Sequence, residues 1–177
     1  MSLLKYKSKR NLKKSGEPKA VLRKFKDKKI TRFSSEAIKK IALQTQKGKS
    51  KKTARLFLFV VHSHFAKQHH YDLRLQVNNV LKSWAVPKEP PIDEKTKRLA
   101  IQVEDHPLSY ANFHGIIPEG NYGAGKVKIW DKGFYIPEKF SDKEIIINIH
   151  GKKLKGKYVL IKTNYSKKSW LWFKGKN

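Results

Sequence analysis

The chain has 177 residues, and its 41 Lys and Arg against 14 Asp and Glu give a net charge of +27. It contains no Cys, which excludes disulfides, thiolate catalysis and zinc sites built from Cys. No apolar run reaches the roughly 18 residues that a membrane span requires, and the N-terminus lacks the apolar stretch of a secretion signal, so we expect a cytoplasmic protein without membrane contact. A charge this positive favours a polyanionic partner such as nucleic acid, because each phosphate that Lys or Arg neutralises releases condensed counterions.

Positive charge is concentrated in residues 1–55, which carry 20 Lys and Arg and 3 Asp and Glu. This part has few large apolar residues and no sustained period, which is typical of an arm rather than of a core. One short helix is expected at residues 35–45, where Ile38, Ile41 and Ala42 share a helical face. We therefore expect residues 1–55 to form a basic arm with one short helix and a linker.

Residues 56–177 have a different pattern, with short alternating or apolar segments typical of β-strands. Asn78 and Asn79 separate two of these segments and are suited to a two-residue hairpin turn, since Asn tolerates positive φ. The segments expected to be strands are 56–62, 70–77, 80–86, 98–104, 126–130, 133–136, 144–150, 158–163 and 169–174. They predict one β domain, an antiparallel barrel or sandwich. Residues 105–125 form the long irregular connection in it, and such connections tend to be functional.

The most informative segment is the expected strand 70–77. Because side chains alternate along a strand, His70, Asp72 and Arg74 share one face at a spacing of about 7 Å. A row of imidazole, carboxylate and guanidinium is costly to bury without a ligand. The same alternation predicts that His69 faces the opposite way and is not part of this row.

Three kinds of site are compatible with this row. His70 and Asp72 suit a divalent ion, with His64 as a third ligand across the intervening turn, and Arg74 suits a phosphate bidentately. The same three ligands also fit the facial triad of non-haem iron oxygenases, where Arg74 would bind an oxo acid. The third alternative is a non-catalytic nucleic-acid binder with a degenerate cluster. The net charge of +27 favours phosphate chemistry over the oxygenase.

A second polar cluster lies at the start of the long connection. Glu104, Asp105, His106 and Tyr110 follow an expected strand, where rigid scaffolds often present reactive groups. His106 is expected to stay protonated near the two carboxylates and to donate to phosphate oxygens, and Tyr110 to hydrogen-bond one. The alternative is a loop that is stabilised by its own polar side chains.

At five stretches the chain resembles the phosphoesterase domain of the bacterial DNA ligase D family. The matching stretches are Phe59–His64, His70–Leu75, Leu81–Lys88, Arg98–Tyr110 and Ile117–Gly125. The resemblance implies a mainly β fold, a small closed antiparallel barrel of about eight strands. It also implies that His64, His70 and Asp72 bind Mn²⁺ or another divalent transition metal. With these ligands, the residues implied to be catalytic are Arg74, His106 and Tyr110, and those implied to bind substrate are Arg10, Asn11, Lys88, Arg98 and Glu104.

The resemblance further implies a reaction and a place in DNA repair. The family removes a 3′-terminal ribonucleoside by phosphodiester cleavage and then hydrolyses the remaining 3′-phosphate, leaving a 3′-OH for a polymerase or ligase in non-homologous end joining. We therefore expect DNA or RNA-terminated DNA 3′ ends as substrate, a monomer, and a ligase or polymerase acting in trans. The family arm contains a Lys-Arg-Asp-Phe type motif followed by Glu-Pro. This chain has Lys9-Arg10-Asn11-Leu12 at that place, and Glu17 and Pro18 follow as in the family. Since Asn11 lacks the carboxylate, diester cleavage is the step expected to differ.

Overall fold

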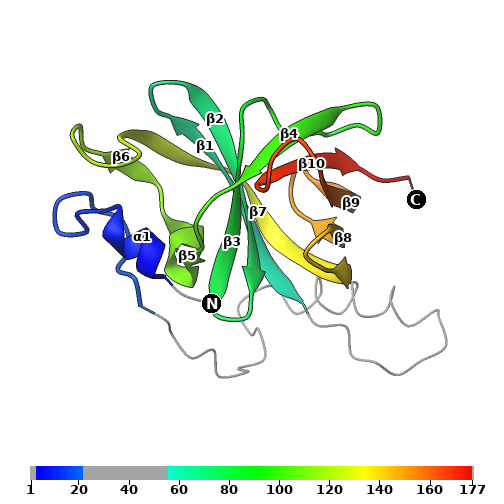
Figure 1. Ribbon diagram of the computed structural model, residues 1–177, viewed down its shortest axis with the longest axis horizontal. Coiled ribbons are helices and arrows are strands. Elements are labelled where there is room, and N and C mark those ends of the chain that lie inside the picture. The colour runs from blue at the N-terminus through cyan, green and yellow to red at the C-terminus, as the bar shows by residue number, and fades with distance from the viewer. Residues whose placement is uncertain (1–2, 22–55, 177) are drawn as a thin grey trace.

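The computed structural model describes residues 3–21 and 56–176, which form a mainly β structure with one short α-helix. The elements in chain order are α1 (Leu4–Ser8), β1 (Phe57–Phe65), β2 (His69–Val77), β3 (Val80–Val86), β4 (Lys97–Gln102), β5 (His106–Pro107), the 3₁₀-helix η1 (Leu108–Asn112), β6 (Gly115–Ile117), β7 (Gly125–Phe140), β8 (Glu144–His150), β9 (Lys155–Lys162) and β10 (Ser169–Lys174). Figure 1 shows how they are arranged. Within these residues no helix has the length and apolar character needed to cross a membrane.

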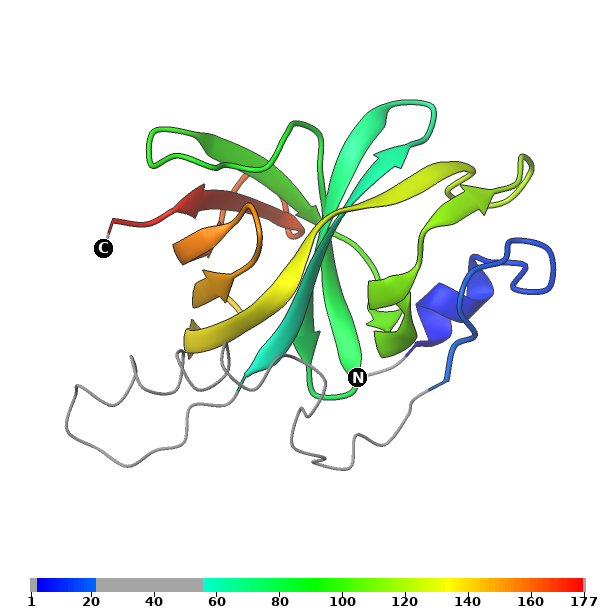
Figure 2. The ribbon, with the colours of Figure 1, turned by 180° about the vertical axis from the view of Figure 1, so that it is seen from behind.

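Eight of the described strands close into an antiparallel barrel. Their order around the ring is β1-β2-β3-β4-β10-β9-β8-β7, and β7 closes the ring by pairing with β1 as well as β8. One strand can pair on both sides along its length because β7 is long and has register shifts, opposite Val61/His62 and between Pro137 and Lys139. Figure 2 shows β7 crossing the barrel from β6 toward β8. The expected closed barrel of about eight strands is confirmed.

The expected break between strands 126–130 and 133–136 is wrong, because both belong to the continuous strand β7. The turn-like residues between them have other roles. A Cβ on Gly133 would lie 2.2 Å from the carbonyl oxygen of His150, so Gly133 allows β7 to pass close to the end of β8. Asp131 is buried, and its carboxylate accepts the backbone N–H groups of residues 152–154.

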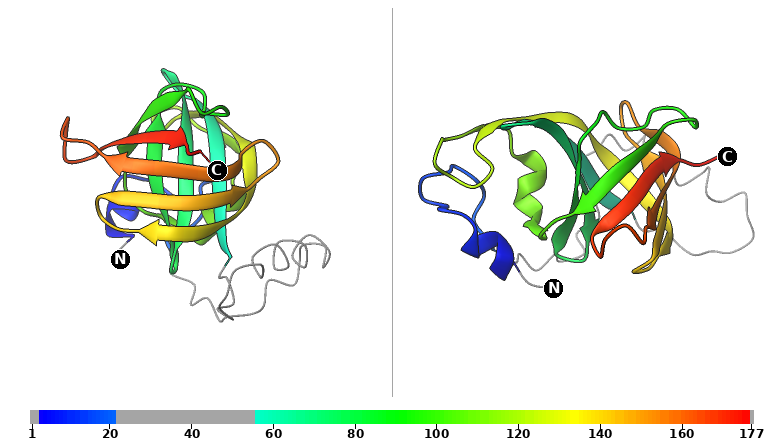
Figure 3. Two further views of the ribbon diagram at one scale, coloured as in Figure 1. Left: turned by 90° about the vertical axis from the view of Figure 1, so that its right-hand side faces the viewer. Right: turned by 45° about the horizontal axis from the view of Figure 1, so that its top comes forward.

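The connection at residues 105–125 is less irregular than expected. It contains β5, which pairs with β3, then η1, and then β6, which pairs with β7. Strands of two and three residues are too short to show alternation in a sequence, which explains why they were not predicted. Figure 3 shows η1 lying between α1 and the barrel, so the connection covers part of the outer wall.

Strands β1, β2 and β3 are buried on both faces. Their inner faces supply part of the barrel core, which consists of Phe59, Val61, Leu73, Leu75, Trp84, Val86, Ala100, Tyr135, Ile145, Ile147, Ile149, Leu154, Tyr158, Leu160, Trp170 and Trp172. On the outer face, Val60 and Leu81 pack in a second, smaller cluster with Tyr6, Tyr110 and Ala111. The arm and η1 therefore cover an outer wall that would otherwise face water.

The first part of the arm is packed against the barrel rather than free of it. Tyr6 is fully buried, and its hydroxyl donates to the carbonyl of Pro18, which folds residues 3–21 back on themselves. Figure 1 shows this segment beside β5 and β6, on the side of the barrel away from β9 and β10. Helix α1 was not predicted, and the helix expected at residues 35–45 lies outside the described residues.

The hairpin turn at Asn78 is confirmed. Asn78 has φ of 52°, and it is the only non-glycine residue with positive φ in the described ranges. The turn sets Val77 opposite Val80, which fixes the register between β2 and β3. As a result, Asp72 and Arg74 of β2 lie opposite Ala85 and Ser83 of β3.

Candidate active site

The outer face of the β1–β2 hairpin carries a polar row across the two strands. His64 lies directly opposite His70, and His62 directly opposite Asp72. Directly opposed residues of an antiparallel pair point to the same face, so the two strands contribute to one surface. Arg74 follows Asp72 on the same face, as alternation along β2 predicts.

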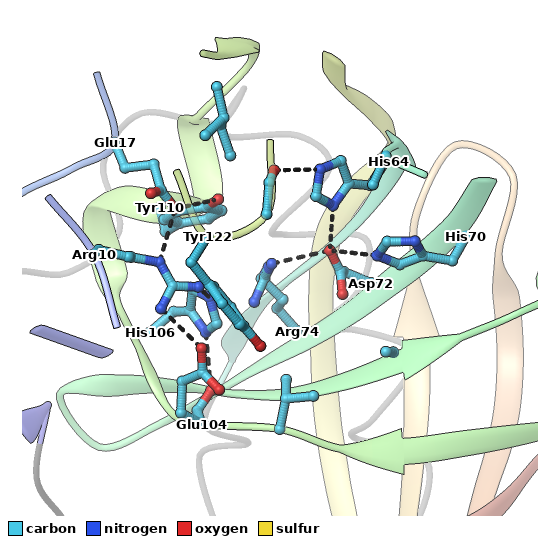
Figure 4. Close-up of a pocket in the computed structure, with 15 residues that line it drawn as sticks. Arg10, Glu17, His64, His70, Asp72, Arg74, Glu104, His106, Tyr110 and Tyr122 are labelled. Carbon is cyan, nitrogen blue, oxygen red and sulfur yellow. Dashed lines mark hydrogen bonds and ion pairs between the residues drawn. The ribbon is translucent and has the colours of Figure 1, made fainter. Parts of the chain in front are cut away.

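Side chains of His64, His70 and Asp72 converge. Their candidate ligand atoms all lie within 4.8 Å of one another. Oδ2 of Asp72 is 3.8 Å from Nδ1 of His64 and 4.0 Å from Nε2 of His70. Figure 4 shows both rings directed at this carboxylate. Two imidazoles and a carboxylate form a donor set that suits a divalent transition metal.

The outer nitrogens of the two rings are already occupied. Nε2 of His64 lies 2.9 Å from the carbonyl oxygen of Gly123, and Nδ1 of His70 lies 2.9 Å from that of Gln68. A carbonyl accepts, so each of these nitrogens carries the proton and the other nitrogen presents its lone pair toward Asp72. Burial lowers the pKa of His64, which also favours the neutral ring that a metal requires. The residues present therefore fit a metal ion.

Gly123 is suited to its position by its backbone. Its φ is +76°, a conformation that other residues rarely adopt, and it turns the carbonyl toward His64. A Cβ there would lie 3.6 Å from the His64 ring, in ordinary contact, so backbone conformation rather than space is what favours glycine at this position.

His69 faces away from this cluster, as the alternation predicts. Its Nε2 lies 2.8 Å from Oγ of Ser63, and its ring stacks on Phe65 at a centroid distance of 4.3 Å. Ser63 and Phe65 alternate with His62 and His64 along β1. His69 is therefore on the opposite face of the hairpin from the polar row.

Arg74 is buried and held by three hydrogen bonds. Its Nε donates to Nδ1 of His62 at 3.3 Å, its Nη1 to Oγ of Ser83 at 2.9 Å, and its Nη2 to Oδ2 of Asp72 at 3.1 Å. The guanidinium also lies 4.6 Å from the ring centre of Tyr110. These contacts fix the plane of the guanidinium beside the cluster of His64, His70 and Asp72.

Arg10 brings a second guanidinium from the arm. It lies between two buried carboxylates, with Nε 2.9 Å from Oε1 of Glu17 and Nη1 2.8 Å from Oε1 of Glu104. Burial lowers the pKa of Arg10, but the bonds to the two carboxylates outweigh this and raise it. Burial raises the pKa of Glu104, but the bonds from Arg10 and Lys9 outweigh this and lower it. The network therefore stays charged in the folded protein.

His106 connects the two arginines. Its Nδ1 lies 2.9 Å from the carbonyl oxygen of Glu104 and 3.2 Å from Oγ of Ser83. Its Nε2 lies 3.2 Å from Nη2 of Arg10, which can only donate. The partners therefore assign the ring proton to Nδ1 and the lone pair to Nε2.

The expectation that His106 stays protonated is wrong. Burial lowers its pKa well below the ordinary value, and the charges of Arg74 and Arg10 lower it further. The carboxylate of Glu104 faces Arg10 instead of His106, and Asp105 pairs with a lysine of β3. The cluster 104–106 thus presents a neutral imidazole in this structure, because the ring is buried and its nearest charged neighbours are cations.

Tyr110 contributes its ring more than its hydroxyl. The hydroxyl donates to Oε1 of Glu17 at 3.0 Å, and burial raises the pKa of Tyr110 so that it stays protonated. The ring packs edge-on against His62 and His106 and lies beneath Arg74. Tyr110 therefore connects the arm to the β1–β2 wall.

These side chains surround one pocket of about 170 Å³, shown in Figure 4. Of the residues expected to act here, those that line it are Arg10, His64, His70, Asp72, Arg74, Glu104, His106 and Tyr110. Asn11, Lys88 and Arg98 do not line it. Asn11 and Lys88 are exposed, and Nε of Arg98 donates to the carbonyl of Glu89 at 2.6 Å. The substrate-binding roles of these three residues stay predictions.

Five further residues in or around the site were not predicted. They are Tyr6, Glu17, His62, Ser83 and Tyr122. His62 was within reach of sequence reasoning, since it lies two residues before His64 and alternation gives both the same face. Ser83 becomes a partner of Arg74 only through the β2–β3 register, and Tyr6, Glu17 and Tyr122 only through the docking of the arm.

Comparison with known proteins decides the family. The family model for the DNA ligase D 3′-phosphoesterase domain matches residues 62–162, more than half of the chain. The chain belongs to this family. Among its relatives, the multifunctional non-homologous end joining DNA repair protein LigD of Mycobacterium tuberculosis is 51% identical over 123 residues, which cover 67% of this chain and 16% of the relative. The multifunctional non-homologous end joining protein LigD of Pseudomonas aeruginosa is 46% identical over 128 residues, which cover 70% of this chain and 15% of the relative.

The family match and the pocket overlap extensively. All residues that line the pocket fall within 62–162 except Arg10 and Glu17 of the arm. This chain spans only about one sixth of the length of these relatives, so the match concerns one phosphoesterase domain. The part of the chain that matches the family therefore contains most of the barrel and most of the pocket residues.

Proposed function

We propose that this protein is a metal-dependent phosphoesterase that heals 3′ ends of DNA, acting on 3′-phosphates and on 3′-terminal ribonucleosides. The observation that carries the proposal is the convergence of His64, His70 and Asp72 within 4.8 Å, directly beside the guanidinium of Arg74. Membership of the 3′-phosphoesterase family supports the reaction class. The names of the relatives support a place in non-homologous end joining.

His64, His70 and Asp72 are the residues that would hold the ion, and Mn²⁺ is the metal we propose. Bound there, a divalent ion would polarise a phosphate oxygen and neutralise charge that develops on it. The protein prepares for this by fixing each ring with a backbone carbonyl, so that the ring nitrogens facing Asp72 are unprotonated. Little rearrangement of the two rings is then needed when the ion binds.

Arg74 is the principal hydrogen-bond donor to the phosphate. A guanidinium has five N–H groups, and three of those in Arg74 are used by His62, Ser83 and Asp72. Two N–H groups remain for phosphate oxygens, and the other three hold the guanidinium in place. A donor that is positioned in advance stabilises developing charge without having to reorganise during the reaction.

Arg10 and His106 complete the anion site from the other side. Arg10 has one N–H beyond those that contact Glu17, Tyr6, Glu104 and His106. The neutral His106 has its Nε2 lone pair toward Arg10, so it accepts from this guanidinium and helps to hold it in place.

The pocket can take a phosphate group. A volume of about 170 Å³ leaves room for a phosphoryl group together with an ion. In hydrolysis, water adds to phosphorus and the bond to the 3′ oxygen breaks, leaving a 3′-OH and free phosphate. The net charge of +27 supports DNA as the carrier of that phosphate, with a ligase or polymerase acting on the product in trans.

Release of phosphate from a DNA primer with a 3′-phosphate tests this function directly. We expect the wild type to release phosphate with Mn²⁺ and to lose this activity with a chelator. The His70→Ala variant should lose at least about a hundredfold, because a ligand that holds the ion is missing. His114→Ala is the matched control, since His114 is exposed and outside the pocket.

Equal rates for wild type and His70→Ala would remove the proposed site. Salt-sensitive DNA binding without turnover in any metal would instead support a non-catalytic binder. A parallel assay with a 3′-terminal ribonucleotide measures the diester-cleaving step separately.

A further inference from the structure

On the face of the β1–β2 hairpin opposite the pocket, four aromatic side chains form a continuous row. We call Phe65, His69, Tyr71 and Trp130 the aromatic ladder. The rings of Phe65 and His69 stack with centroids 4.3 Å apart and 10° between their planes. His69 follows with Tyr71 at 5.0 Å, and Tyr71 with Trp130 at 5.9 Å. The row extends from the end of β1 to β7.

Strand register explains why these side chains share a face. Phe65 lies directly opposite His69, and Ser63 directly opposite Tyr71, so each pair points to the same side of the hairpin. This is the side of Val61 and Leu73, which fill the barrel core. The ladder is therefore an extension of the barrel interior to its open end, where the rings become accessible.

The ladder is exposed at Phe65, partly buried at Trp130, and has a lysine beside each of these ends. Phe65 is 44% exposed, although a phenylalanine at the tip of a hairpin contributes nothing to the barrel core. The ammonium of Lys128 lies 5.4 Å from the ring centre of Phe65, and that of Lys153 lies 4.3 Å from the ring centre of Trp130. Burial raises the pKa of Tyr71, and the charge of Glu89 raises it further.

Accessible rings with adjacent lysines match the chemistry of single-stranded nucleic acid. Each base offers an apolar face that stacks on an aromatic ring, and each phosphate offers a charge for a flexible lysine. A base stacking on Phe65 would displace the Lys128 ammonium toward a phosphate. A duplex, whose bases are already stacked on one another, could use the lysines but not the rings.

We propose that the aromatic ladder binds unpaired nucleotides of single-stranded DNA by stacking, with Lys128 and Lys153 contacting their phosphates. Phe65 and His69 are sequence neighbours of His64 and His70, so the ladder lies immediately behind the pocket on the same two strands. The link to catalysis rests on the proposed function, since it assumes that the DNA bound here has its 3′ end in the pocket.

Fluorescence anisotropy with labelled oligothymidylate, in the absence of metal, tests the ladder. We expect Phe65→Ala to weaken binding about tenfold, because one stacked base is lost. Phe65→Ala should bind an abasic oligomer of the same length as well as the wild type does, since this ligand offers phosphates without bases. Lys128→Gln should weaken the binding of both oligomers and reduce the slope of log K against log salt by about 0.7.

Controls separate stacking from folding. Phe65→Leu keeps an apolar side chain without an aromatic face, and it should bind like Phe65→Ala, while Phe65→Tyr should bind like the wild type. Thermal melting of each variant checks the fold. If Phe65→Leu and Phe65→Ala bind oligothymidylate as well as the wild type does, the ladder does not bind bases. An equal loss for oligothymidylate and the abasic oligomer also overturns the proposal.

The two proposals can fail independently. Phosphate release from a 3′-phosphorylated mononucleotide needs the pocket but no bound strand, so Phe65→Ala should leave it unchanged. If the wild type never releases phosphate but Phe65→Ala still weakens oligothymidylate binding, the phosphoesterase function fails and the ladder stands. If phosphate is released but the Phe65 variants bind normally, the ladder fails and the phosphoesterase stands.

Discussion

The two halves of the pocket are built in different ways. The metal half, defined as His64, His70 and Asp72, comes from one hairpin. Its ligand atoms face one another, and the carboxylate of Asp72 also pairs with Arg74. The anion half, defined as Arg10, Glu17, Glu104, His106 and Tyr110, joins the arm to segments about 90 residues away. In the anion half, the charged groups are buried and paired with one another.

This difference indicates that the two halves depend on different parts of the fold. The β1–β2 hairpin is held by the barrel itself, so the metal half should form whenever the barrel folds. The anion half requires residues 3–21 to be docked as well, because Arg10 and Glu17 belong to that segment. Substitutions should therefore separate metal affinity from phosphate binding.

Arg74, which lies between the halves, should give the largest effect. Arg74→Lys keeps the charge but cannot reproduce three directed bonds to His62, Ser83 and Asp72 while leaving donors free. We expect kcat for 3′-phosphate release to fall about 10²- to 10³-fold, with Mn²⁺ affinity retained. Lys95→Arg makes the reverse exchange at an exposed position outside the pocket and should cost less than about fivefold. Similar losses at both positions would contradict the assigned role of Arg74.

Glu17→Gln should affect the anion half alone. The amide keeps the shape and an acceptor for Tyr110 but removes the charge that faces Nε of Arg10. We expect the free energy of unfolding in urea to fall by about 1–3 kcal/mol, and phosphate release to fall about tenfold. Mn²⁺ affinity should not change, and Glu119→Gln, at an exposed loop position, is the control. A large loss of Mn²⁺ affinity would show that the halves are not separate.

Acidification should weaken the anion half through His106. Its pKa is about 6.5 in an unfolded chain and well below that in the folded protein. Between the two values the unfolded state binds more protons, so stability from a neutral His106 is fully present above pH 6.5 and is lost as pH falls toward the folded pKa. Urea denaturation of wild type and His106→Asn across this range should show a smaller pH dependence in the variant. Parallel curves for the two proteins would exclude His106 as the titrating group.

The smallest effect is expected for Asn11→Asp. Asn11 is exposed and outside the pocket, and an Asp there restores the carboxylate of the family motif. We expect the ratio of diester cleavage to phosphate release to rise by no more than about threefold, since exposed substitutions have small effects. An unchanged ratio would show that an acid at position 11 does not act on diester cleavage.

The two halves also differ in how far the sequence predicted them. Alternation along one strand placed His70, Asp72 and Arg74 on a common face and turned His69 away, and both outcomes hold because period-2 geometry is local. The same local rule explains the hairpin at Asn78. The strands are long enough to show a pattern, which predicted a barrel or a sandwich, and the resemblance to the family favoured the closed barrel.

The anion half was beyond local rules. The resemblance to the family implied that Arg10 and Glu104 bind substrate, but their ion pair spans 94 positions and depends on the docking of the arm. The charges in the sequence were also misleading. Glu104 and Asp105 were expected to keep His106 protonated, but in the fold each carboxylate pairs with another residue. Spacing along the sequence does not reveal which of several possible partners a carboxylate pairs with in the folded chain.

Direct measurement of Mn²⁺ binding tests most sharply whether His64, His70 and Asp72 form one metal site. Isothermal titration calorimetry of the wild type should give one Mn²⁺ per chain, and Asp72→Asn should weaken binding at least about a hundredfold. His69→Ala, one position from His70 but on the other face, should bind Mn²⁺ like the wild type. Unchanged Mn²⁺ binding in Asp72→Asn, or loss of binding in His69→Ala, would contradict the proposed metal site.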